Sequence, residues 1–315
     1  MDELPTDSGV TFVKRMRAIG DPDQRLRGAA GKRELVRLRR GAYVRRADAE
    51  RDDRDAAYRL RIVAVVGTRR SAVVLSHHSA ALLHGLPVAD AWPRDVHITE
   101  PRESRRRSKN GVVVHRSPSL GDIVEVDGML VTSVVRTVID LAADGAFADA
   151  VCVADAALRL GVERDELRAE VEARPGPGRA RARRVVEFAD PLAETSLESW
   201  SRASIEELGF PRPVLQHPVP TPRGIRRLDL AWPEIGAGAE ADGLWKYGAI
   251  AEAAGMSGLD AFRAEKEREA EIRMQLRAFT RWGVDELRDP EKLRRRLLSL
   301  GLRPLPPYRP NHPSP

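Results

Sequence analysis

The stretch that decides the fold of the C-terminal half is 225–246, IRRLDLAWPEIGAGAEADGLWK. Apolar and charged residues alternate over 225–232, turn-forming residues follow over 233–236, and a second short run covers 237–242. This pattern predicts a hairpin with Glu234 and Ile235 at its tip, so that position 233 faces position 236. In that register Asp229 falls directly opposite Glu240.

The predicted hairpin places three carboxylates close together. Cross-strand partners lie about 4.5–5.5 Å apart at Cβ, and like charges at that distance are destabilising. Glu240 and Asp242 are two residues apart, so both side chains leave the same face of the strand. A hard divalent cation with oxygen ligands would neutralise them. The alternative is that the carboxylates face water, or that the turn is shifted by one residue, which moves a side chain to the other face.

Length and composition set the class of protein. The chain has 315 residues, which is room for about two domains. Its net charge of +6 and pI of about 9.8 favour an anionic partner such as nucleic acid. The single cysteine, Cys152, excludes an internal disulfide, and its apolar neighbours predict a buried, inert thiol. The polar N-terminus and the lack of an apolar run of about 18 residues predict a cytoplasmic protein with no membrane partner.

The N-terminal region has the outline of a winged helix. We expect helices over 12–19 and 21–30, followed by a basic hairpin over 35–44 that turns at Gly41. In a winged helix the second helix enters the major groove and the wing contacts phosphates. Three arginines of the hairpin would make these contacts: Arg37, Arg39 and Arg40. The alternative is a small αβ cap whose arginines stay solvated.

Several phrases in order carry a resemblance to a known family. They are GAYV (41–44), SHHSAALLHGLP (76–87), DVHITEP (95–101), GVVVHRS (111–117) and VDGMLVTSVVRTVIDLA (126–142). This order resembles AbiEi-type antitoxins of type IV toxin–antitoxin systems, over roughly residues 20–165. The resemblance implies a transcriptional regulator with a winged helix and an αβ region, and hence DNA as a partner. A cognate toxin would be encoded by a neighbouring gene, so this sequence leaves the toxin and the oligomeric state open.

The middle of the chain predicts helices and strands around a basic loop. We expect a helix over 54–67, strands over 95–99 and 112–115, and between them the loop 102–111, RESRRRSKNG. The loop is either a solvated tip or a phosphate-contacting element. Its three consecutive arginines are Arg105, Arg106 and Arg107.

A short histidine-rich helix is expected over 77–83, capped by Ser76 and ended by Gly85. His77 and His84 are seven residues apart, so they share a helical face but are too distant to bind one ion easily. With no cysteine nearby, the sequence predicts packed or hydrogen-bonded histidines rather than a metal site.

The remaining elements set the domain division. We expect a capped helix over 132–142 with Arg136 and Asp140 paired on one face, and a second helix over 147–160. The stretch 174–183 reads as a linker or loop. Beyond it we expect a helix over 190–208, a strand over 213–219, the hairpin, a charged helix over 260–276, a strand over 277–282 and a helix over 285–300. This gives a winged-helix-like segment (1–46), an αβ domain (47–175), a C-terminal domain (190–303) and a disordered tail (304–315).

The C-terminal order of elements carries a second resemblance. The matching phrases are ETSLES (194–199), GFPRPVLQHPV (209–219), GIRRLDLAWPE (224–234), EADGLWKY (240–247) and EKEREAEIR (265–273). They resemble the PD-(D/E)XK nuclease-like fold, closest to the DUF559 / very-short-patch-repair-like group. The expected fold class is therefore α/β (α+β), with a restriction-endonuclease-like mixed sheet flanked by helices.

This resemblance implies a magnesium-dependent endonuclease that hydrolyses DNA phosphodiesters. Asp229 and Glu240 would be the Mg²⁺ ligands, and Glu198 the helical carboxylate that completes the site. Asp242 stands where the wider fold has lysine, so Lys246 or Lys266 would supply the positive charge. The alternative is a non-catalytic, AbiEi-like regulator whose arginines fill the space between the carboxylates. The two readings differ in whether these side chains converge.

Overall fold

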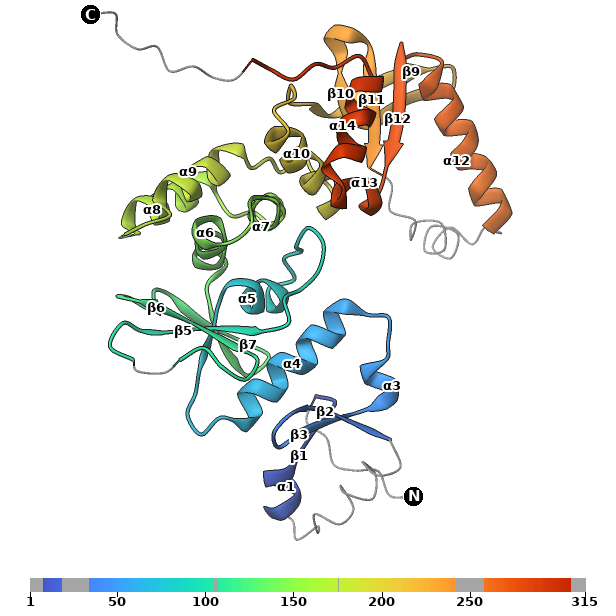
Figure 1. Ribbon diagram of the computed structural model, residues 1–315. Helices are drawn as coiled ribbons and strands as arrows, with labels where there is room; N and C mark the ends of the chain where they lie inside the picture. The colour runs from blue at the N-terminus through green and yellow to red at the C-terminus, as the bar shows by residue number, and fades with distance from the viewer. Residues whose placement is uncertain (1–7, 19–33, 105–106, 175, 242–257, 307–315) are drawn as a thin grey trace, which may run out of the picture. The chain divides into compact units, whose positions relative to one another are not determined.

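The computed structural model describes residues 8–18, 34–104, 107–174, 176–241 and 258–306. The fold is α+β, with three sheets and flanking helices (Figure 1). The chain divides into two compact units, one formed by 1–146 and 161–187 and the other by 147–160 and 188–315. The sequence predicted that 147–160 belongs to the αβ domain (47–175). In the structure the contacts of this segment place it in the C-terminal unit. No helix within the described ranges has the length and apolar composition that a membrane span requires.

The N-terminal sheet is antiparallel, in the order β1-β3-β2. Its elements are β1 (Val10–Phe12), α1 (Val13–Ala18), β2 (Leu35–Arg39) and β3 (Ala42–Arg45). The basic hairpin turns at Gly41, as predicted, and Gly41 has a left-handed φ of 87°. The sheet packs on α4 (Arg54–Thr68), which follows the short α3 (Arg46–Ala49). The helix expected over 21–30 lies wholly outside the described residues.

A five-stranded sheet forms the centre of the first unit. Its order is β6-β5-β4-β8-β7, from β4 (Val74–Leu75), β5 (Val96–Pro101), β6 (Val112–Ser117), β7 (Ile123–Val126) and β8 (Met129–Thr132). The helices are α5 (His77–Leu83), α6 (Val134–Asp144), α8 (Arg164–Ala173) and α9 (Arg179–Phe188). Buried apolar side chains of α4 and the strands form its core. Neighbouring strands β5 and β6 run parallel, so His97 is in register with Val113, and Thr99 with His115.

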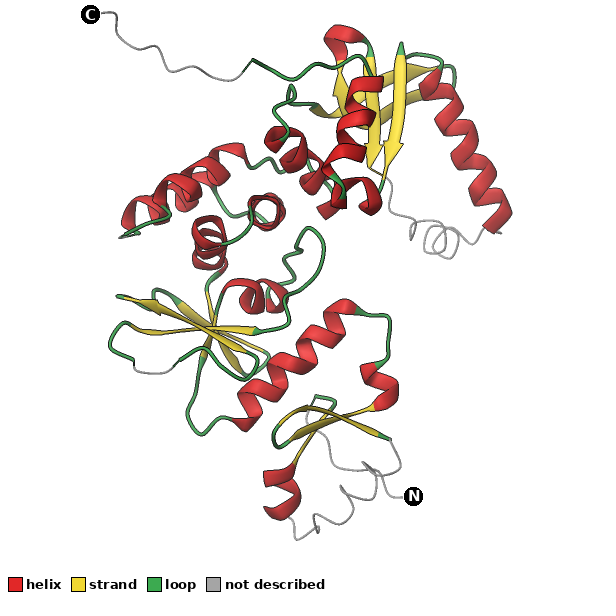
Figure 2. Ribbon diagram, viewed as in Figure 1, coloured by secondary structure: helices red, strands yellow, loops and turns green. Residues whose placement is uncertain are grey.

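The C-terminal unit is a four-stranded mixed sheet in the order β12-β11-β10-β9, with helices on both sides (Figure 2). The strands are β9 (Val214–Thr221), β10 (Gly224–Trp232), β11 (Ala237–Ala241) and β12 (Ala278–Trp282). The helices are α7 (Phe147–Arg159), α10 (Ser196–Glu207), α12 (Gly258–Arg273), α13 (Val284–Arg288) and α14 (Pro290–Ser299). This is the sheet flanked by helices that the sequence predicts.

The register of the central hairpin is confirmed. Leu230 pairs with Ala239, and Trp232 with Ala237. The tip is the 3-10 turn η1 (Pro233–Ile235), which Gly236 ends with a left-handed φ of 63°. Continued by one position beyond the last pair, Leu230 and Ala239, this register sets Asp229 opposite Glu240, as in the predicted hairpin.

Two helix boundaries differ from the prediction. The helix expected from position 190 begins at Ser196, because Asp190 forms a turn in which its carboxylate accepts the Leu192 amide. Thr195 is the N-cap and accepts the Glu198 amide. Helix α9 begins at Arg179, inside the stretch read as a linker, because the Arg and Ala residues that follow the glycines are strong helix formers.

Candidate functional site

Glu240, the second predicted metal ligand, is buried and held by two arginines. Its side chain is 3% exposed. Arg281, its register partner on the parallel strand β12, donates from Nε to Oε2 at 2.9 Å. Arg268 on α12 places Nη2 2.8 Å from the other oxygen, Oε1. Each carboxylate oxygen therefore has a guanidinium beside it.

Asp229, the first predicted ligand, is half-buried on β10. Its Oδ2 accepts a hydrogen bond from the Ala241 amide at 3.1 Å. The neighbouring strand contributes Gln216, which stands opposite Asp229 by register and has a left-handed φ of 48°. The ladder is interrupted at this point, between the pairs on either side.

Glu198 has a local structural role at the start of α10. It is 2% exposed, and its oxygens accept from the Glu194 amide at 2.9 Å and the Thr195 hydroxyl at 2.8 Å. Together with the Thr195 cap, this is a variant of the capping box. The Gln216 amide donates a third bond at 3.1 Å. Gln216 thereby links Glu198 to the strand position beside Asp229.

Two predicted residues of this site, Asp242 and Lys246, lie outside the described residues. Lys266 is exposed and pairs with Glu269 one turn along α12, at 3.0 Å. Glu269 also lies 3.3 Å from Arg281. Among the described residues, the positive charge beside Glu240 comes from Arg268 and Arg281, which the sequence did not assign.

The described residues of this site do not fit a magnesium ion as they are arranged. Mg²⁺ requires carboxylate or water oxygens in near-octahedral geometry. Both oxygens of Glu240 face guanidinium groups, and Asp229 Oδ2 accepts a backbone amide. The three donors to Glu198 make it a structural acceptor.

The predicted phosphate-contacting residues lie in two places of the first unit. Arg37 and Arg40 are exposed on the basic hairpin, whereas Arg39 is half-buried. Arg39 Nη1 is buried without a hydrogen-bond partner. Burial, and secondly the charge of Arg69, lower the pKa of Arg39. In the second loop, Arg107 is exposed, while Arg105 and Arg106 fall outside the described residues.

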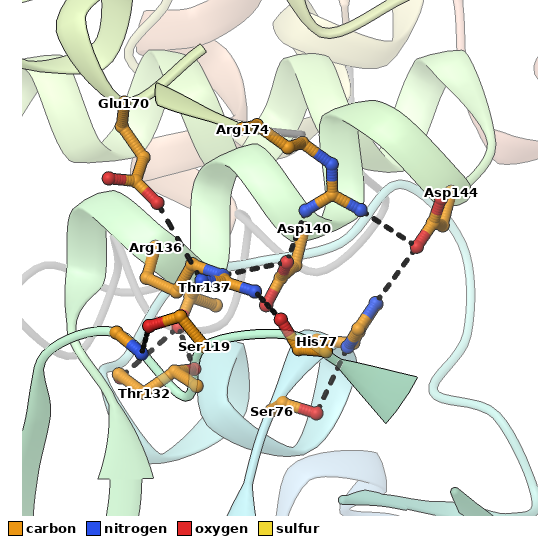
Figure 3. Close-up of polar contacts among 12 residues, drawn as sticks. Ser76, His77, Ser119, Thr132, Arg136, Thr137, Asp140, Asp144, Glu170 and Arg174 are labelled. Atoms are coloured by element: carbon orange, nitrogen blue, oxygen red, sulfur yellow. Dashed lines mark hydrogen bonds and ion pairs between the residues drawn. The ribbon is translucent and has the colours of Figure 1, made fainter. Parts of the chain in front are cut away.

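A buried ion network joins α6 to α8, and Figure 3 shows its side chains. The predicted pair is confirmed: Arg136 Nε donates to Asp140 at 2.9 Å. Asp140 is 2% exposed and also accepts from Arg174, which follows α8, at 2.7 Å. Arg174 reaches Asp144 at 3.2 Å. This network fixes the end of α6, where Asp144 approaches His77.

Three histidines converge beside this network, and the sequence did not predict them as a group. His77 begins α5, His97 lies on β5 and His115 on β6, and one nitrogen from each lies within 4.8 Å of the others. His97 Nδ1 and His115 Nε2 are 2.9 Å apart. The rings of His77 and His115 are stacked, with centroids 3.5 Å apart.

The environment of these histidines keeps two of them neutral. Burial, and then the neighbouring histidines, lower the pKa of His97 to about 2. Burial and His77 lower the pKa of His115 to about 4. The only sequence feature that pointed to this cluster was the presence of one histidine, His97 or His115, in each of two predicted strands. Helical spacing alone could not reveal it, because the parallel register of β5 and β6 brings His97 and His115 together.

The comparisons find proteins that are similar to this chain, but none of their names states an activity. No family model matches the chain. Uncharacterized protein MT2308 of Mycobacterium tuberculosis (strain CDC 1551 / Oshkosh) and Uncharacterized protein Rv2248 of strain ATCC 25618 / H37Rv are each 32% identical over 174 residues. The match covers 54% of this chain and 63% of the length of each relative. The crystal structure of RV2827C protein from Mycobacterium tuberculosis is 20% identical, with a TM-score of 0.38, over 56% of this chain and 71% of that chain.

Proposed function

We propose that this protein binds DNA through its N-terminal basic segment, residues 8–46, as a cytoplasmic, non-catalytic regulator of the AbiEi type. Residues 8–46 contain twelve Lys and Arg against three Asp and Glu, although the net charge of the whole chain is only +6. Concentrated positive charge of this kind is the electrostatic footprint of a nucleic-acid-binding segment.

The observation that carries the proposal is the state of Arg39. Its guanidinium has a buried nitrogen without a hydrogen-bond partner and stands near the like charge of Arg69. Such an arrangement is unfavourable in isolation, because a buried charged donor without an acceptor loses its hydration. A DNA phosphate beside the hairpin would offset the repulsion between Arg39 and Arg69. Exposed Arg37 and Arg40 flank Arg39 on the same hairpin.

The arrangement of Glu240 supports the non-catalytic reading. Arg281 donates to one of its oxygens, and the Arg268 guanidinium lies 2.8 Å from the other, which makes no hydrogen bond of normal geometry. A nuclease site requires those oxygens for its cation, whereas a site filled by arginines is stable without one. The C-terminal sheet then serves as a scaffold.

The experiment is DNA binding measured by fluorescence anisotropy over a range of salt. Wild-type protein is expected to bind duplex DNA with affinity that falls as salt rises, by a logarithmic slope of about −0.9 for each phosphate contacted. The triple substitution Arg37→Ala, Arg39→Ala, Arg40→Ala is expected to weaken binding at least about tenfold at low salt, and to reduce the slope by about two to three.

The matched control removes three arginines elsewhere: Arg168→Ala, Arg212→Ala and Arg223→Ala. Each is paired with a carboxylate on the surface, and the change in net charge is the same. The control is expected to bind DNA as wild type does. Absence of binding by the wild type, or an equal loss in both triple variants, would overturn the proposal.

A second candidate, the endonuclease, is favoured by one observation, the hairpin register that brings Asp229 opposite Glu240. Plasmid nicking by the full chain in Mg²⁺, Mn²⁺ and EDTA tests it, beside Asp229→Asn, which keeps the shape of the side chain. Under the proposed function no preparation cleaves. Cleavage that requires the metal and disappears in the variant would replace the non-catalytic reading with the nuclease.

A further inference from the structure

The histidine cluster has the architecture of a built site. His97 and His115 come from adjacent strands and lie on one face of the sheet, and His77 comes from the start of α5, which packs on β5. One ring nitrogen from each side chain lies within 4.8 Å of the other two. The hydrogen bond of 2.9 Å between His97 Nδ1 and His115 Nε2 needs one proton between two basic nitrogens. A metal ion can take the place of that proton.

His77 is buried and held in a conformation that its residue type rarely adopts. Its side chain is 4% exposed, and its φ is 51°, in the left-handed region. A non-glycine residue there stores strain, which structures retain where the surroundings impose it. Ser76, at the N-cap of α5, makes no capping hydrogen bond; its hydroxyl lies 3.0 Å from His77 Nδ1. The serine is therefore placed to fix the orientation of the imidazole.

The other ring nitrogen of His77 has no ordinary hydrogen-bond partner. His77 Nε2 is buried and makes no hydrogen bond of normal geometry. Its closest acidic neighbour is Asp144 Oδ2, at 3.5 Å. Metal-binding histidines typically use one nitrogen for the ion and the other for an orienting hydrogen bond. His77 has this division, with Ser76 as the orienting group.

The three histidine nitrogens, at most 4.8 Å apart, reach the dimensions of a tetrahedral zinc site by small adjustments. Zn–N bonds of about 2.0–2.1 Å place ligand atoms about 3.3–3.4 Å apart. The 3.5 Å between His77 Nε2 and Asp144 Oδ2 is close to this value. The 2.9 Å between His97 and His115 must widen by about 0.4–0.5 Å to reach the tetrahedral separation, which small side-chain rotations supply.

We propose that His77, His97 and His115 bind one Zn²⁺ ion, with Asp144 beside His77. Imidazole nitrogens select zinc and related transition metals over Mg²⁺, which prefers oxygen. The site joins α5 to β5 and β6, and the ion network of Arg174 positions Asp144. It is separate from the carboxylates of the C-terminal sheet, which belong to the other unit.

The experiment is metal titration of the full chain after treatment with EDTA and its removal. Calorimetry with Zn²⁺ is expected to give one ion per chain, and Mg²⁺ no binding. Co²⁺ in place of Zn²⁺ is expected to give the visible absorption of a low-coordinate, nitrogen-bound site. His115→Gln is expected to lose at least about a hundredfold in Zn²⁺ affinity, and Ser76→Ala about tenfold.

The control is His217→Gln, the same chemical change at a half-buried histidine of the other unit. It is expected to retain wild-type Zn²⁺ affinity, and circular dichroism verifies the fold of each variant. If His115→Gln fails to fold, the wild-type Co²⁺ spectrum and Ser76→Ala still decide. A wild-type chain that binds no Zn²⁺, or one whose affinity Ser76→Ala and His115→Gln leave unchanged, would overturn the proposal.

Discussion

Individual residues show where reading the sequence succeeded and where it failed. The register that sets Asp229 opposite Glu240 followed from the turn residues and the alternation around them, and the structure confirms it. The partners of Glu240 did not follow, because Arg281 belongs to a strand that pairs in parallel and begins 37 positions after β11 ends. Glu198 was assigned to the site, although the phrase Thr-Ser-Leu-Glu also reads as a capping box. A carboxylate can be located from sequence more readily than its counter-charge.

Cys152 shows how burial controls chemical reactivity. Its thiol is 1% exposed, and burial raises its pKa well above the ordinary value. Only the thiolate reacts with disulfide reagents, so the folded protein is expected to react slowly at pH 7 and no faster at pH 9. In urea the rate is expected to rise with pH until the ordinary pKa is reached. Absorbance of the released thiol measures both rates, and rapid labelling of the folded chain would contradict the prediction.

The same shift fixes the direction of a pH effect on stability. The unfolded thiol loses its proton near its ordinary pKa of 9.0, whereas the folded thiol keeps it to higher pH. The folded state therefore binds more protons above that pH, and the contribution of this group to stability falls as pH rises through it.

Pairs of elements depend on buried ions that connect distant parts of the sequence. Arg202 of α10 donates to Asp155 of α7 at 2.7 Å, and the two side chains are 7% and 0% exposed. Arg202 also donates to the Phe188 carbonyl and stacks over its ring. The sequence assigned these two helices to different domains. Their packing could not be predicted, because helix periodicity identifies a buried face without identifying its partner.

Arg202→Met is expected to destabilise the fold by about 3–5 kcal/mol, because it leaves the Asp155 carboxylate buried with one fewer cation. Urea denaturation measures the free energy of unfolding. The control is Arg46→Met, which removes an exposed pair with Glu50 and is expected to cost less than about 1 kcal/mol. An equal loss in the free energy of unfolding for the two substitutions would show that the buried pair contributes no more to stability than the exposed pair.

At the scale of the whole molecule, the two units are interleaved along the chain. The first unit uses 1–146 and 161–187, and the second uses 147–160 and 188–315. Composition suggested one boundary in the stretch 174–183, because proline, glycine and arginine are common in linkers. The actual path enters the second unit for α7, returns for α8 and α9, and then enters it again.

This division predicts how fragments behave. A fragment of residues 190–303, the domain expected from sequence, lacks α7 and so leaves one side of α10 uncovered and Arg202 without Asp155. We expect it to unfold without a cooperative transition on heating. A fragment of residues 147–303 is expected to unfold cooperatively, and circular dichroism during heating distinguishes the two. Cooperative unfolding of the shorter fragment would show that α7 is dispensable.

The interleaving also imposes an order in time on a newly made chain. Helix α7 is complete at Arg159, but its partner α10 ends at Glu207. At about 5–20 residues per second, a ribosome needs about 2–10 s to synthesise the intervening segment. During that interval the apolar face of α7 is exposed to solvent. The first unit is also incomplete until α8 and α9 have been synthesised. Synthesis therefore passes through a stage in which neither unit is complete and the face of α7 is open to chaperones.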